Sequence, residues 1–180
     1  MKKLILSLLV AAFVGGNTLS AQTITKNEDG KYSLSVGHVT LTVDAQKGGK
    51  IVSYRYDDKE ILSQTKIPNS FGSTFWTSPQ SEWNWPPVPE YDTKPFNAEV
   101  AGDKLILTGE KSKRFGYRVR KELTTDKKDN AIVITYTFIN ESGETRKVAP
   151  WEISRVPNGG ILFFDAKEVT PANNMETMPF

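Results

Sequence analysis

Short stretches of alternating apolar and polar residues, separated by turn residues, run through this chain from residue 31 to residue 164. In residues 39–43, VTLTV, the apolar side chains alternate with threonine, which is the period of a half-buried strand. Beyond residue 21, no window of eleven or more residues has the apolar period of a helix. About ten short strands at regular spacing predict an all-β fold, an antiparallel β-sandwich or a part of one.

Strands joined by polar or glycine-containing turns are expected over most of the chain. Strand 131–139 has apolar residues on both faces, which predicts a central position in a sheet. The basic residues between Lys111 and Lys121 are expected to form a solvated strand face, and His38 to occupy a turn or an edge. The expected strands are 31–36, 39–43, 51–56, 60–62, 96–101, 104–109, 115–123, 131–139, 147–156 and 160–164.

Residues 1–21 have the order of a secretory signal peptide. A basic start precedes an apolar run, residues 4–14, that is too short to span a bilayer, and small and polar residues lead to a cleavage point before Gln22. No cysteine follows, so the protein is not expected to be a lipoprotein. The sequence predicts a periplasmic or secreted protein without a stable membrane anchor after cleavage, with residues 22–180 as one domain. The alternative is an uncleaved anchor.

Charge and cysteine content exclude several classes of partner and cofactor. Cleavage would remove two of the 23 basic residues and leave 21 against 21 acidic ones, a balance that argues against nucleic acid as a partner. The chain has no cysteine and one histidine, so we expect no disulfide, no metal site and no cofactor.

The segment Phe71–Tyr91 concentrates aromatic residues and prolines. It contains three of the four tryptophans and four of the ten prolines, and proline opposes both a regular helix and a central strand. The sequence therefore predicts a long, stiff loop. Indole rings among short polar side chains suit a sugar, whose C–H face stacks on an aromatic ring. The predicted carbohydrate-binding residues of this loop are Trp76, Trp83, Trp85, Gln80 and Glu82.

A second interpretation of the same loop is structural. Its tryptophans would then fill the open end of a β-sandwich and have no ligand. Both interpretations remain open on the sequence alone.

Three blocks resemble the galactose-mutarotase-like superfamily, the aldose-epimerase-like supersandwiches. They are GGKIVSYRYDDKEIL (48–62), YRVRKELTTDKKDNAIVITYTFINES (117–142) and APWEISRVPNGGILFF (149–164). The aromatic loop is similar to that of one branch of exported bacterial proteins, a domain of unknown function. The resemblance covers residues 30–165 and implies a sandwich that acts on, or binds, carbohydrates. All three blocks match the family's N-terminal half, which implies a truncated chain that is marginally stable and aggregates or dimerises through open strand edges.

Catalysis of the family's kind is doubtful for this chain. The family uses histidine as acid and glutamate as base, and the matching strand, APWEISRV (149–156), has no histidine. Glu152 is the best catalytic candidate, on one face with Ser154. The alternative is that it is a solvent-facing residue paired with a neighbouring arginine. Arg155, on the opposite face with Trp151, is a candidate for substrate binding.

Three functions follow as hypotheses from these residues. The first is an exported carbohydrate-binding protein that resembles aldose 1-epimerases. The second is a sugar epimerase or polysaccharide-active enzyme that uses carboxylates in place of histidine. The third is a non-functional fragment of a longer protein.

Overall fold

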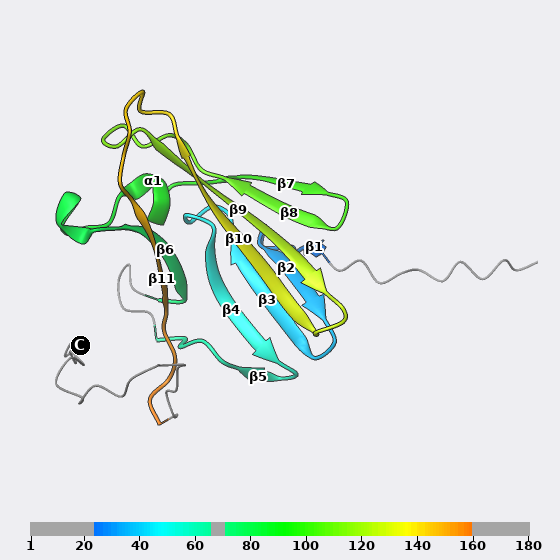
Figure 1. The fold of residues 1–180 in the computed structure, drawn as a ribbon. Coiled ribbons are helices and arrows are strands. Elements are labelled where there is room, and N and C mark those ends of the chain that lie inside the picture. Colours follow the sequence, from blue (N-terminus) through cyan, green and yellow to red (C-terminus); the bar gives the residue numbers. More distant parts are fainter. Residues whose placement is uncertain (1–23, 66–70, 160–180) are drawn as a thin grey trace, which may run out of the picture.

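Two antiparallel sheets face each other in the computed structural model, which describes residues 24–65 and 71–159 (Figure 1). The predicted signal peptide and the predicted strand 160–164 lie outside these residues. Within them, eleven strands are joined by turns and loops, with one short α-helix, α1 (Pro89–Asp92), and one 3-10 turn, η1 (Gln80–Glu82). No helix in this part of the chain is long and apolar enough to cross a membrane.

The first sheet has the strand order β1-β2-β3-β4-β6-β11, with β5 paired to β4. Hairpin β2–β3 turns at Gly37 and His38, and Gly37 takes the positive φ of 53° that glycine adopts at little cost. The strands are β1 (Ile24–Lys26), β2 (Tyr32–Val36), β3 (Val39–Asp44), β4 (Lys50–Tyr56), β5 (Lys59–Glu60), β6 (Ser73–Ser78) and β11 (Ala149–Ser154).

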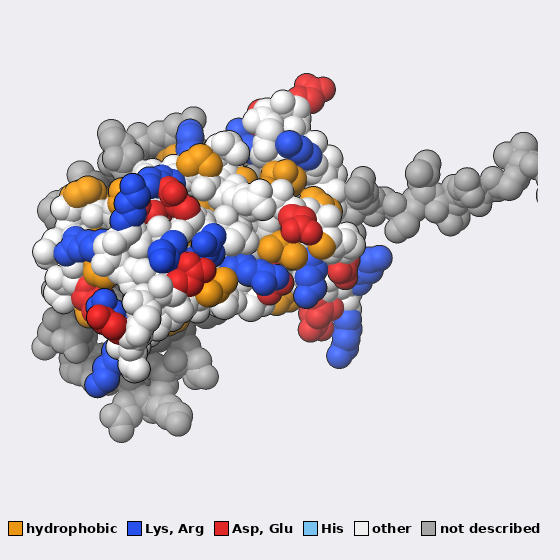
Figure 2. Space-filling view, turned by 90° about the horizontal axis from the view of Figure 1, so that it is seen from above, with side chains coloured by type: hydrophobic (Ala, Val, Ile, Leu, Met, Phe, Trp, Pro, Cys, Tyr) orange, Lys and Arg blue, Asp and Glu red, His pale blue; other side chains and the backbone are white. Residues whose placement is uncertain are grey.

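The second sheet has the order β10-β9-β8-β7. Strands β9 and β10 pair over ten residues each, from Tyr117 opposite Asn140 to Asp126 opposite Ala131. The strands are β7 (Asn97–Ala101), β8 (Lys104–Thr108), β9 (Tyr117–Asp126) and β10 (Ala131–Asn140). On the face drawn in Figure 2, basic and acidic side chains are interspersed.

The core lies between the sheets and is built by alternation along the strands. Leu34 of β2 and Leu105 and Leu107 of β8 are fully buried. Phe75 of β6 stacks on Tyr136 of β10, with ring centroids 4.0 Å apart. Apolar side chains buried from both sides make this an all-β antiparallel sandwich, as the sequence predicts.

Two predictions about strand position are wrong. Strand β10 lies at the edge of the second sheet in the described part of the chain, where it pairs with β9 alone. Apolar residues on its outer face, such as the exposed Val133, therefore did not indicate a central strand. The segment Phe71–Tyr91 is not a loop throughout. Its first half forms β6, which lies between β4 and β11 and is buried along its length, and the prolines begin only where β6 ends.

Candidate functional site

Strands β6 and β11 form the element on which most of the predicted site residues lie. Their register pairs Phe75 with Glu152 and Trp76 with Trp151. Because successive side chains point to opposite faces, Glu152 and Trp151 lie on opposite sides of the sheet. Gly72, with φ of 69°, brings the start of β6 against β4, since a Cβ there would lie 2.3 Å from the Ile51 carbonyl oxygen.

One side of β6 and β11 faces β10 across the interior of the sandwich. We call it the inner face and define it by Ser73, Phe75, Glu152 and Ser154. Glu152 accepts a hydrogen bond from the Ser73 hydroxyl, and the Ser154 hydroxyl donates to Ser73 Oγ at 3.0 Å. Glu152 therefore shares a face with Ser154, as predicted. The alternative in which it pairs with an arginine is not seen, since no ion pair between described residues includes Glu152.

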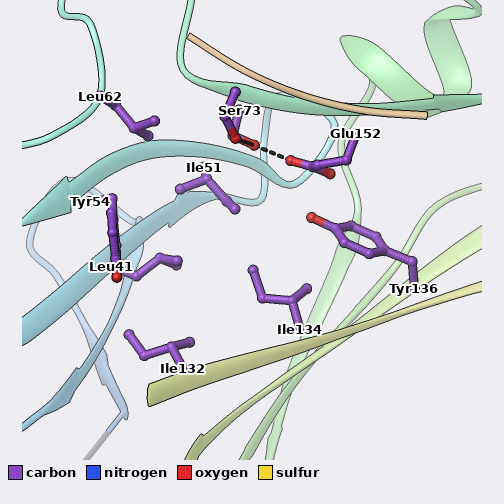
Figure 3. Close-up of a pocket in the computed structure, with 10 residues that line it drawn as sticks. Leu41, Ile51, Tyr54, Leu62, Ser73, Ile132, Ile134, Tyr136 and Glu152 are labelled. Atoms are coloured by element: carbon purple, nitrogen blue, oxygen red, sulfur yellow. Dashed lines mark hydrogen bonds between the residues drawn. The ribbon is translucent and has the colours of Figure 1, made fainter. Parts of the chain in front are cut away.

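A cavity of about 310 Å³ opens between this inner face and β10 (Figure 3). Tyr136 points its hydroxyl toward the Glu152 carboxylate. Burial and the negative charge of that carboxylate both raise the pKa of Tyr136, so its hydroxyl stays protonated. The cavity is lined by Leu41, Ile51, Tyr54, Leu62, Ser73, Ile132, Ile134, Tyr136, Glu152 and Ser154.

The opposite side of β6 and β11 carries what we call the aromatic face, defined by Trp76, Trp83, Trp85, Trp151 and Arg155. Trp76 is its centre: the other three indole rings lie 5.7 to 6.0 Å from it, each edge-on. The buried indole nitrogens are satisfied, because Trp76 Nε1 donates to Asp92 Oδ1 at 3.0 Å and Trp83 Nε1 donates to the Thr77 carbonyl at 2.9 Å.

The three tryptophans predicted to bind sugar differ in exposure. Trp76 and Trp83 are each only 4% exposed, and their rings are covered by protein. Trp85 is 58% exposed and presents its ring to solvent. The structural interpretation of the segment therefore fits Trp76 and Trp83, which are buried. The sugar-binding interpretation fits Trp85, which is accessible to a ligand.

Two polar residues of the same segment lie beside the aromatic face, in η1. Gln80 is exposed and Glu82 is half-buried. Arg114 holds η1 in place through a hydrogen bond from its guanidinium to the Glu82 backbone carbonyl. The Glu82 carboxylate and the Gln80 amide have no role in that bond and remain candidates for contact with a ligand.

Arg155 lies on the aromatic face with its guanidinium 5.8 Å from the Trp76 ring centroid. Its Nη1 donates to the Gly72 carbonyl at 3.3 Å and to Thr74 Oγ1 at 3.4 Å. Burial lowers the pKa of Arg155, which the Asp92 carboxylate partly offsets. Arg155 stays charged at neutral pH because its unperturbed pKa is so high.

Lys50 of β4 forms a buried ion pair with Asp92, the last residue of α1. Its Nζ lies 3.8 Å from Asp92 Oδ1, and both side chains are almost fully buried. Burial lowers the pKa of Lys50, Asp92 raises it and the charge of Arg155 lowers it further. Asp92 therefore joins the buried ammonium of Lys50 to the indole of Trp76, which donates to the same carboxylate.

Lys121 is the clearest error of the sequence interpretation, which placed it on a solvated basic face. It is 4% exposed, and its Nζ donates to the carbonyls of Gly48 and Gly49 at 2.8 and 2.9 Å. The alternation of β9 carries the signal for this burial, because Lys121 has the parity of Val119 and Leu123. Burial lowers the pKa of Lys121 to about 8.

His38 occupies the turn between β2 and β3, as predicted, and its Nδ1 lies 2.6 Å from Asp57 Oδ1 at an exposed position. Across residues 24–65 and 71–159, no group of three or more His, Cys, Asp or Glu side chains is arranged to hold a metal ion. The aromatic face thus gathers most of the predicted binding residues, while the sheet separates them from Glu152.

Comparison with known proteins finds no matching family model and no matching curated protein. One similar solved structure is the crystal structure of 4-alpha-glucanotransferase from Thermococcus litoralis, with 15% sequence identity and a TM-score of 0.40. The match covers 63% of this chain and 23% of that chain, so this chain spans less than a quarter of its length. A likeness of this extent does not establish a shared family.

Proposed function

We propose that this chain is an exported carbohydrate-binding protein, periplasmic or secreted, that binds a mono- or oligosaccharide on the aromatic face. The observation that carries the proposal is the exposed indole of Trp85, which is held edge-on against the buried Trp76 at 6.0 Å. A rigid, exposed aromatic ring is the feature on which the C–H face of a pyranose stacks, because ordering it costs little conformational entropy.

Polar groups around Trp85 supply the hydrogen bonds that sugar hydroxyls require. The exposed Gln80 amide and the Glu82 carboxylate follow β6 on the same segment. Arg155 donates from Nη1 to Gly72 and Thr74, and its guanidinium carries further N–H groups. The resemblance of the three sequence blocks to carbohydrate-active supersandwiches supports the same class of ligand.

Binding without catalysis accounts for the arrangement best. Acid–base chemistry on a sugar requires an acid and a base beside the same ring. The catalytic candidate Glu152 lies on the inner face, across the sheet from Trp85 and Arg155. The competing hypothesis, a carboxylate-dependent epimerase or polysaccharide-active enzyme, would require the sugar to occupy the cavity beside Glu152.

Substitution on each side of the sheet separates the two hypotheses. Trp85→Ala should reduce saccharide affinity about tenfold, through loss of the stacking contact and of buried area. Glu152→Gln, the matched control on the inner face, should leave affinity unchanged. Isothermal titration calorimetry with a panel of neutral oligosaccharides, preceded by a glycan array to choose them, measures both effects.

The opposite result favours the enzyme hypothesis. If Glu152→Gln weakens binding or abolishes turnover while Trp85→Ala has no effect, the sugar site is the cavity and the proposal is wrong. A protein that binds no saccharide on the array also contradicts it.

A further inference from the structure

The cavity between the sheets has a composition that differs from that of the aromatic face. Five aliphatic side chains line it: Leu41 and Ile51 from β3 and β4, Leu62, and Ile132 and Ile134 from β10. Figure 3 shows the isoleucines of β10 facing the Ser73–Glu152 pair across the open space. A volume of about 310 Å³ is at the small end of ligand pockets, which run from roughly 300 to 1,000 Å³.

One formal charge faces this apolar space. Glu152 is an exposed residue and also lines the cavity. The Ser73 hydroxyl donates to it. The charge of Lys121 interacts with that of Glu152, but its ammonium donates to the Gly48 and Gly49 carbonyls and forms no ion pair with Glu152. A ligand that brings its own cation is therefore complementary to the carboxylate.

The remaining lining favours an aliphatic chain over a sugar ring. The Ser73, Ser154 and Tyr136 hydroxyls lie at the Glu152 end, and Tyr54 supplies one further hydroxyl. The five aliphatic residues that form the rest of the lining offer no hydrogen-bond partners. An unbranched alkyl chain buries its surface against these side chains, with its polar head at Glu152. Burial of apolar area supplies the affinity, and the carboxylate selects the head group.

We propose that the cavity between the sheets binds an amphipathic primary amine, with its alkyl chain against Ile132 and Ile134 and its ammonium group at Glu152. The site is independent of the saccharide site, because the β6–β11 sheet separates the two.

Three probes with one alkyl chain test the head-group preference: n-octylammonium chloride, n-octanol and sodium octanoate, titrated into the full chain by calorimetry. The ammonium should bind about fivefold more tightly than the alcohol, the upper range for a partly exposed ion pair. Octanoate should bind more weakly than either. A series from butyl- through hexyl- to octylammonium should tighten Kd about fifteenfold per two methylene groups.

Variants connect these effects to the cavity. Glu152→Gln, which keeps the shape and removes the charge, should give octylammonium and octanol equal affinity. Ile134→Trp, which fills the cavity, should weaken both at least tenfold. Trp85→Ala, on the aromatic face, should change neither, whether or not it affects saccharides.

The proposal is overturned if octylammonium does not bind, if octanol or octanoate binds as tightly as octylammonium, or if affinity is independent of chain length. The proposal is also overturned if a folded Glu152→Gln variant still binds octylammonium more tightly than octanol. Saccharide binding is measured separately on the same variants, so failure of one site does not bear on the other.

Discussion

Lys121 shows at the scale of a single residue how burial and charge are combined in this fold. A lysine at an inward position is destabilising unless its ammonium is hydrogen-bonded, and the Gly48 and Gly49 carbonyls supply those bonds. The rings of Phe96 and Tyr136 lie 5.2 and 5.8 Å from its Nζ and add cation–π contact. The parity of β9 predicts the burial, but the identity of its partners depends on a loop distant in sequence.

Lys121 should make stability depend on pH. Its pKa in the folded protein is about 8, below the 10.5 that is usual for a lysine exposed to water. Between these two pH values the unfolded chain binds more protons than the folded one, so stability rises with pH. From pH 7.5 to 9.5, wild type should gain about 2 kcal/mol relative to Lys121→Met. Urea denaturation at each pH measures this difference.

A matched control is Lys104→Met, an exposed lysine on β8. Its free energy of unfolding should stay parallel to that of wild type over the same range. Parallel profiles for Lys121→Met would show that Lys121 titrates normally and that burial has no effect on its protonation.

At the scale of the element, the local sequence pattern predicted where most strands lie along the chain, but it did not predict the order of the strands in the sheets. Hairpins β2–β3, β7–β8 and β9–β10 follow from alternation and turn residues, because each pairs neighbours in sequence. Strand β6 pairs with β11, more than seventy positions along the chain, and its serines and threonines hide its apolar face. Such long-range pairing leaves no local signal, so the sequence, which placed Glu152 and Trp151 on opposite faces, did not reveal that Trp76 lies on the side of Trp151.

Strand β10 should mediate self-association through its edge. The strand is ten residues long and contains no charged residue, proline or glycine, so it lacks the usual protection of an edge. Val133 is 45% exposed on it. Val133→Lys should reduce concentration-dependent association with little change in thermal stability, as measured by sedimentation velocity.

The control is a substitution on β7, the strand at the other edge of the second sheet. Val100 of β7 is 44% exposed and already lies next to Glu99. Val100→Lys adds the same charge and should leave association unchanged. Equal effects of both substitutions would point to net charge and not to β10.

At the scale of the whole molecule, the stacking of Phe75 connects the two sheets. Its ring lies between the sheets against Tyr136 and Phe138, with centroids 4.0 and 5.2 Å away. Phe75→Ala should lower the free energy of unfolding by about 3–5 kcal/mol, because it removes buried area and leaves a cavity. Tyr56→Ala, at a 54% exposed position, should cost well under that amount in the same urea titration. Similar costs for the two would mean that the sheets do not pack through Phe75.

The sequence predicted the fold class because alternation is a property of each strand. It also predicted most residues of the aromatic face, since three of its tryptophans are close in sequence. It placed Trp151 with Arg155 on one face but did not connect them to the tryptophans of the loop. It missed Lys50 and Asp92, which carry no shared motif. Which tryptophans are buried depends on the packing of α1 and η1 over β6, and composition does not encode that packing.

The most direct test of saccharide binding is the NMR spectrum of the indole N–H groups during titration with an oligosaccharide. Trp85→Phe removes one signal and so assigns it. We predict that the Trp85 signal shifts in a saturable manner, while that of Trp83, whose Nε1 is bonded to the Thr77 carbonyl, moves least. If the Trp85 signal does not move at saccharide concentrations that saturate binding, the aromatic face is not the sugar site.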